Sequence, residues 1–177
     1  MLDALKRWRH RRVLERAALP DPLWSEALAS LPFLAQYDGE ELARLRDLCV
    51  LFLDRKSIVG AGGHDVTPLQ RVVIAIQACV LVLGLSLDWY DGFESVVVYP
   101  DEFVPDWTWE DEAGVVHTND GPLAGEAMPG GPVALSWPDV EALPEAEADR
   151  LLTGDGGELI DVDPALDARD DETGPAK

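Results

Sequence analysis

Apolar residues recur at steps of three and four positions in two stretches near the start of the chain, a spacing typical of amphipathic helices. The first stretch follows Asp21-Pro22, which offers a capping side chain and an initial proline. The second follows Asp38, with Glu41 three positions later as in a capping box. The pattern therefore predicts helices over about 21–31 and 39–54.

A third helical stretch is apolar on every side. It begins at Thr67 and ends near Gly84, and its segment 72–83 is interrupted only by Gln77. A helix without a polar face belongs in the core, yet the residues after Trp137 supply few apolar partners to cover it. We therefore expect this helix to be buried all round in a complete core. In this chain we expect part of its surface to be exposed, paired in an oligomer or covered by the tail.

After the third helix, the pattern changes to short β-branched runs bounded by Gly, Pro and an Asp-Gly turn. Strands are predicted over 95–99, 114–117 and 131–137. The predicted fold class is α+β, with N-terminal helices, one of them buried and apolar, packed on a small mixed sheet.

Charge divides the chain into regions. The 34 acidic and 14 basic side chains give a net charge of −20 at pH 7, which argues against direct nucleic-acid binding. Residues 1–16 form a basic arm, 17–140 a helix-plus-sheet domain, and 141–177 an acidic tail that we expect to be disordered. The arm is either a solvated, frayed terminus or a short amphipathic helix that docks on the acidic body or touches a membrane surface.

No segment has the pattern of a signal peptide or a transmembrane helix. The opening residues are basic but lack an apolar core behind them, and the apolar run 72–83 is shorter than the roughly 20 residues that a spanning helix needs. Cys49 and Cys79 lie in apolar runs and form no CxxC pair. We therefore expect a reducing, cytoplasmic setting and no transmembrane segment.

Isolated polar residues give only weak signals for chemistry. His64 and His117 have carboxylates nearby that could complete a zinc site, but the two histidines are too far apart to share a helical turn, and ordinary surface histidines are more common. Asp161-Val162-Asp163 hints at calcium but lacks the Gly and Glu of an EF-hand loop. The sequence contains no phosphate-binding loop, nucleophile elbow or Cys/His pair.

Several segments taken together resemble one family in order, spacing and residue type over roughly residues 20–140. Besides the long apolar helix they are Leu23-Trp24-Ser25-Glu26-Ala27-Leu28, Trp89-Tyr90-Asp91-Gly92-Phe93-Glu94-Ser95-Val96-Val97-Val98-Tyr99-Pro100, Phe103, Trp109-Glu110, Gly114-Val115-Val116-His117 and Gly131-Pro132-Val133-Ala134-Leu135-Ser136-Trp137. This combination resembles the N-terminal half of the MtfA (Mlc titration factor A) family of zinc-dependent peptidases.

The resemblance implies a cytoplasmic bacterial protein with a zincin-like fold and zinc-dependent, aminopeptidase-like activity. Family members also bind Mlc, the repressor of glucose-uptake genes, and draw it away from its operators. In zincins a strand beside the cleft pairs with the extended substrate, and the next helix carries His-Glu-x-x-His, which ligates zinc and activates water. By position, this implies two substrate-strand candidates, either of which could equally be sheet core: Val115, Val116 and His117 as an exposed edge, and Val133, Ala134, Leu135 and Ser136 as the strand before that helix.

The sequence departs from the family at the catalytic motif. None of His10, His64 and His117 is followed by glutamate, so His-Glu-x-x-His is absent, no catalytic or metal-ligating residue is assigned, and no zinc site is supported. We expect a truncated, divergent or frame-shifted relative that is inactive alone and acts on a peptide substrate only if the catalytic half is restored.

Partner binding is the function expected to survive without the motif, with an Mlc-like repressor as the partner. The alternative is a non-enzymatic, acidic interaction module that binds a basic protein such as a transcription repressor. A further alternative is a peripheral membrane protein tethered by the basic arm.

Overall fold

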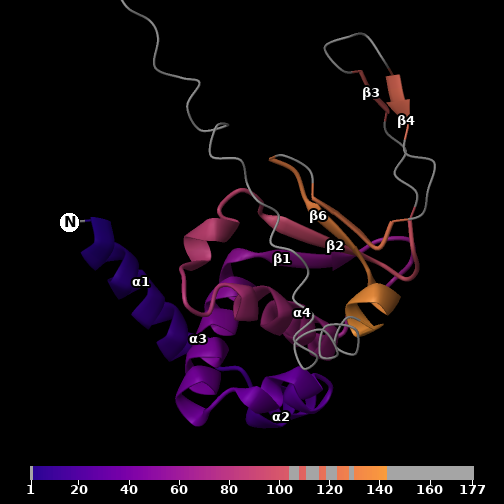
Figure 1. Ribbon diagram of the computed structural model, residues 1–177. Coiled ribbons are helices and arrows are strands. Elements are labelled where there is room, and N and C mark those ends of the chain that lie inside the picture. Colours follow the sequence, from indigo (N-terminus) through magenta and orange to yellow (C-terminus); the bar gives the residue numbers. More distant parts are fainter. Residues whose placement is uncertain (1, 104–107, 111–115, 119–122, 128–129, 143–177) are drawn as a thin grey trace, which may run out of the picture.

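Helices dominate the first part of the chain and strands the later part (Figure 1). The computed structural model describes residues 2–103, 108–110, 116–118, 123–127 and 130–142. The helical elements are α1 (Leu2–Arg16), α2 (Asp21–Ala29), the 3₁₀ helix η1 (Pro32–Gln36), α3 (Gly39–Arg55), α4 (Pro68–Leu81) and the 3₁₀ helix η2 (Leu87–Tyr90). The strands are β1 (Ser57–Gly60), β2 (Ser95–Tyr99), β3 (Thr108–Glu110), β4 (Val116–Thr118), β5 (Gly125–Ala127) and β6 (Val133–Ser136), and residues 137–142 are helical.

Side-chain caps fix where α3 and α4 begin. The Asp38 carboxylate accepts hydrogen bonds from the first turn of α3, while the Asp38 N–H donates to the Glu41 carboxylate. Thr67 and Gln70 make the same reciprocal pair at the start of α4. Each capping box satisfies backbone N–H groups that have no partner within the helix. Both predicted starts are confirmed.

The first predicted helix is shorter than its predicted span. α2 ends at Ala29, and η1 begins at Pro32, so the predicted span of 21–31 covers a helix and the turn that follows it. The capping role predicted for Asp21 is wrong, because Asp21 is the first helical residue and caps nothing with its side chain. Its carboxylate instead lies 2.5 Å from the Arg46 guanidinium of α3, which joins the two helices.

The main sheet has four strands in the order β1-β2-β6-β5. The strands β1, β2 and β6 are parallel, and β5 is antiparallel to β6. The register places Ile58, Val96 and Val133 side by side, and Val98 beside Leu135. This sheet is therefore mixed, and the predicted α+β class is confirmed.

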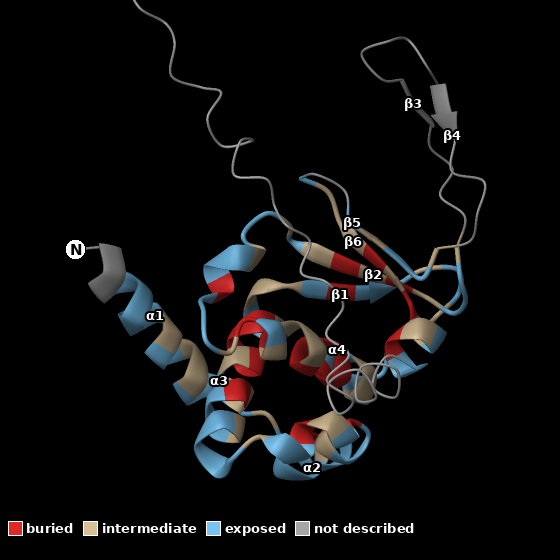
Figure 2. Cartoon of the chain, in the orientation of Figure 1, coloured by how far each residue is buried: buried red, intermediate tan, exposed pale blue. Residues whose placement is uncertain are grey.

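The core lies between this sheet and α3 and α4 (Figure 2). Phe52 of α3, Ile76 of α4, and Ile58 and Val98 of the sheet are each almost completely buried within one apolar cluster. These contacts remove large apolar side chains from water, the main favourable contribution to folding. No helix in the described segments is long and apolar enough to cross a bilayer.

Two of the strand predictions match strands of the main sheet. The strand predicted over 95–99 matches β2, and that predicted over 131–137 contains β6, after which residues 137–142 turn into a helix. The strands β1 and β5 are not predicted, because β1 has one buried residue in four and β5 is Gly-Glu-Ala. Pairing with neighbouring strands, rather than local propensity, places both in the sheet.

The basic arm is a helix docked on α3, so the interpretation as a frayed terminus is wrong. Val13 and Leu14 of α1 pack against the core cluster. Arg16 pairs with Asp54 of α3 at 3.0 Å, and Lys6 pairs with Asp88 of η2 at 3.0 Å. The proposed boundaries of the domain and the acidic tail remain predictions, since residues 143–177 lie outside the described residues.

Candidate functional site

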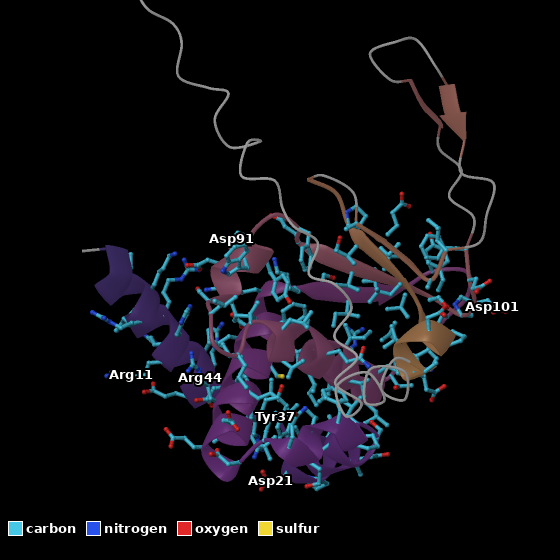
Figure 3. The ribbon with its side chains drawn as sticks, viewed as in Figure 1. Arg11, Asp21, Tyr37, Arg44, Asp91 and Asp101 are labelled. Carbon is cyan, nitrogen blue, oxygen red and sulfur yellow. The ribbon has the colours of Figure 1, made fainter. Side chains whose placement is uncertain are left out.

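An apolar groove of about 620 Å³ runs between α4 and the sheet. Its walls come from η1, α3, α4, η2, β2, β6 and the helical segment 137–142. Nearly all of its lining is aliphatic or aromatic: Phe33, Tyr37, Phe52, Ile74, Ala78, Val80, Leu81, Tyr90, Phe93, Val96, Val133, Leu135 and Val140, together with Gln77. Tyr37 is labelled in Figure 3 close to α2. A concave, mostly apolar surface of this size is typical of a binding site.

The last turn of α4 opens onto this groove. Residues 72–76 and Cys79 are buried, but Leu81 is 75% exposed, so the prediction of burial all round is wrong at the C-terminal end of the helix. Two more large apolar side chains of the adjoining segment, Leu85 and Trp89, are also mostly exposed. Within the described residues part of this surface is therefore uncovered, and whether the tail or a second copy covers it stays a prediction.

Two polar groups in the wall of the groove, on Gln77 and Tyr90, are already paired. The Gln77 amide donates to the Val140 carbonyl oxygen at 2.8 Å, and the Tyr90 hydroxyl donates to the Ala78 carbonyl oxygen at 2.7 Å. Burial, together with the nearby Cys79 thiol, raises the pKa of Tyr90, so this hydroxyl remains protonated at neutral pH. The described wall therefore favours an apolar occupant.

Lys56 holds the aromatic rim of the groove in place. Its ammonium donates to the backbone carbonyl oxygens of Tyr90 and Phe93 and lies 4.3 Å from the centre of the Phe93 ring. Burial of the ammonium lowers the pKa of Lys56, with Asp91 acting in the opposite direction. Tyr90 packs edge-to-face against both Phe93 and Phe52. The rim is therefore fixed by one cation and a small aromatic cluster.

Four of the predicted substrate-strand residues lie in β6, inside the sheet. β6 pairs with β2 on one side and β5 on the other, so its backbone groups are occupied on both sides. Val133 and Leu135 face the apolar groove, whereas Ala134 and Ser136 are buried in alternation with them. The edge strand on this side of the sheet is β5, which sequence reasoning missed.

A glycine at the start of β5 was the available signal for this edge. A side chain at Gly125 would begin 3.3 Å from the Ala134 carbonyl oxygen and 3.4 Å from Leu135, so the backbone approaches β6 closely. A glycine at such a position within a strand indicates close packing of neighbouring chain. In the sequence it reads as part of a Gly- and Pro-rich connection, which hides the strand.

The other predicted strand lies outside the four-stranded sheet. Val116 and His117 belong to β4, which pairs with β3 in a separate two-stranded ribbon, with His117 opposite Trp109. Val115 lies outside the described residues. The two predicted segments, β4 and β6, are therefore not neighbours in one sheet.

The described residues do not bring together the donors of a metal site. No three His, Cys, Asp or Glu side chains of these segments lie close enough to hold one ion. Burial and the neighbouring Cys79 thiol raise the pKa of Cys49, so this thiol is a packed core group rather than a nucleophile. Ser136 is fully buried, and its hydroxyl has no hydrogen-bond partner among the described residues, so no base activates it there. The set of donors on these segments therefore does not fit a catalytic zinc ion.

Comparison with known proteins identifies similar sequences. A sequence model of the glucose-regulated metallo-peptidase M90 family matches residues 5–151. This range includes most of α1, the apolar groove and the whole four-stranded sheet.

Several curated proteins are similar to most of this chain. Mlc titration factor A of Klebsiella pneumoniae is 36% identical over 139 residues, which cover 78% of this chain and 52% of that protein. The proteins of the same name from Salmonella arizonae and Escherichia fergusonii are each 34% identical over 155 residues, which cover 88% of this chain and 60% and 57% of those proteins. The chain thus spans a little over half the length of the curated relatives that it matches.

Proposed function

The chain belongs to the glucose-regulated metallopeptidase family M90, and from this premise we propose that it is the partner-binding, non-hydrolytic part of a peptidase of the Mlc titration factor A type. In this proposal the sheet and α4 form a scaffold whose apolar groove receives a protein segment. The scaffold works in the cytoplasm, where the repressors of sugar-uptake genes act.

The apolar groove is the observation that carries this proposal. The exposed Leu81 lines it together with Val133 and Leu135 of β6. A partner that buries Leu81 would remove a large apolar side chain from water, which is the usual source of binding energy at an interface. β5 is the last strand of the four-stranded sheet and has no further partner strand among the described residues, so its outer edge is available to an extended segment of a partner.

Hydrolysis is assigned to the family and not to this chain by itself. A zinc peptidase needs three protein ligands and a base that activates water. The sequence contains no His-Glu-x-x-His, and the donors on the described segments do not fit a zinc ion. Aminopeptidase activity on a peptide substrate would therefore require the catalytic helix of a longer protein.

A protease assay tests whether the chain by itself hydrolyses peptides. The purified chain, with added zinc, is incubated with alanine p-nitroanilide and with a peptide library, and a zinc aminopeptidase serves as the positive control. We expect no hydrolysis above the blank. Turnover that copurifies with the chain and is lost on adding a chelator would contradict the proposal.

Binding is tested with a substitution at the open end of the groove. Leu81→Asp places a charge on the apolar surface without entering the core, because Leu81 is 75% exposed. We expect this variant to bind a purified Mlc-type repressor about tenfold more weakly or worse in calorimetric titration, since burying an uncompensated charge is costly. The matched control is Leu5→Asp, an exposed leucine on α1, which should bind like the unmodified chain.

An acidic interaction module is the second candidate, and the net charge of −20 is the observation that favours it. Binding through the acidic surface would weaken steeply between low and high salt, because exposed charges are screened within about 8 Å at physiological ionic strength. Binding through the apolar groove would change little with salt. The same titration at two salt concentrations therefore separates the two candidates.

A further inference from the structure

The two sides of α1 carry different chemistry. The side toward the body is held by Val13 and Leu14 in the core cluster and by the ion pairs of Lys6 and Arg16. His10, also on this side, accepts a hydrogen bond from Arg55 at 2.6 Å if it is neutral. With this side occupied, the helix presents its other side to solvent in a fixed orientation.

The outward face of α1 combines exposed apolar side chains with arginines. Leu5 and Trp8 are each more than half exposed, and they recur with Arg12 at helical spacing. The Arg12 guanidinium lies 5.1 Å from the centre of the Trp8 ring. Arg11 points away from α3 (Figure 3). Neither Arg11 nor Arg12 makes an ion pair with a carboxylate of the described residues, including the nearby Glu15.

We propose that this outward face of α1, made of Leu5, Trp8, Arg11 and Arg12, binds the surface of an anionic phospholipid bilayer. Arginine guanidinium groups pair with lipid phosphates, and tryptophan places its ring at the level of the headgroups. An exposed Trp and Leu between arginines fits a surface that offers both anionic groups and an apolar layer. A nucleic acid offers the anionic groups without that apolar layer, so it would leave the exposed Leu5 and Trp8 without an apolar environment.

The negative charge of the body does not prevent this contact. Two acidic side chains of the body that contact α1, Asp54 and Asp88, are paired with Arg16 and Lys6. The outward face lies beyond them by the width of a helix, about 10–12 Å. This distance exceeds the screening length of about 8 Å at physiological salt, so the bilayer faces the local positive charge of α1.

Vesicle sedimentation with the full 177-residue chain tests the proposal. The vesicles contain either phosphatidylcholine alone or phosphatidylcholine with one quarter phosphatidylglycerol. We expect at least about tenfold stronger binding to the anionic vesicles, because each arginine near such a surface contributes roughly fivefold in affinity. The double variant Arg11→Gln/Arg12→Gln should therefore bind them about 25-fold more weakly.

The matched control removes the same charge elsewhere. Arg44 of α3 and Arg71 of α4 are both exposed and make no ion pair with the described residues, so Arg44→Gln/Arg71→Gln should bind the anionic vesicles like the unmodified chain. Trp8→Ala should reduce binding about tenfold, the value expected for losing one buried aromatic side chain. All these substitutions lie on exposed positions, and circular dichroism checks that the helices persist.

Three outcomes would overturn the proposal. Equal binding to neutral and anionic vesicles would mean that the apolar groove, not α1, enters the bilayer. An equal loss of binding in the control double variant would mean that net charge alone determines binding to the anionic vesicles. Unchanged binding of Trp8→Ala would exclude insertion of the tryptophan.

Discussion

The interface that holds α1 and the interface that holds α4 differ in kind. α1 is attached by two partly buried apolar side chains and by ion pairs at exposed positions, whereas α4 is attached by residues 72–76 and Cys79, all buried in the core. Exposed ion pairs contribute about 0–1 kcal/mol each, and burial of an aliphatic side chain contributes about 1.5–3 kcal/mol. We therefore expect that α1 can detach without unfolding the rest of the domain, whereas loss of α4 and its groove requires unfolding of the whole domain.

The largest effect is expected in the core beside the groove. Phe52→Ala should lower the free energy of unfolding by about 3–5 kcal/mol, because Phe52 is 1% exposed and its removal leaves a cavity against Tyr90. Urea denaturation followed by circular dichroism measures the change. A loss below about 1 kcal/mol would mean that this part of the core is loosely packed.

A smaller effect is expected at the rim of the groove. Lys56→Met leaves the carbonyl oxygens of Tyr90 and Phe93 without their donor, and should cost about 1–3 kcal/mol of unfolding free energy. The matched control is Lys6→Met on α1, which breaks only the exposed ion pair with Asp88 and should cost about 1 kcal/mol or less. Equal losses from both variants, again by urea denaturation, would contradict the distinction between the two interfaces.

The smallest effect is a pH dependence that resides in α1. Burial and the adjacent Arg55 lower the pKa of His10 below its usual value of about 6.5, with Asp88 acting in the opposite direction. Below about pH 6.5 the unfolded chain therefore binds more protons at this residue than the folded chain, so this contribution to stability is present above that pH and is lost as the pH falls.

The variant His10→Gln isolates this contribution, since its amide can still accept from Arg55 but does not titrate. Thermal unfolding midpoints are measured for both proteins between pH 7.5 and pH 5. We expect the unmodified chain to lose more stability over this interval than the variant. Parallel curves would show that His10 does not titrate differently in the folded state.

The sequence predicts the elements whose ends and interiors are locally encoded. Asp38 and Thr67 cap α3 and α4, and the β-branched run of β2 is unambiguous. The sequence also indicates that part of α4 is uncovered, because the residues after Trp137 supply too few apolar side chains to cover it. These features depend on neighbours along the chain or on simple counting, which the sequence displays directly.

The features that the sequence does not predict depend on residues far apart in the chain. β5 is a strand only because it pairs with β6. Asp21 forms an ion pair with Arg46 instead of capping its own helix. The sequence offers the docking of α1 on the acidic body only as one alternative, because no local pattern links Lys6 to Asp88 or Arg16 to Asp54. The roles of the predicted residues in β4 and β6 as substrate strands remain predictions.

We propose that the chain binds an Mlc-type repressor without a metal. Calorimetric titration of the chain with an Mlc-type repressor, carried out once with equimolar zinc and once with a chelator, tests it most directly. We expect the same dissociation constant in both conditions, because the groove is apolar and the described segments hold no metal-binding cluster. Binding of one zinc per chain, with affinity for the repressor lost on chelation, would contradict it.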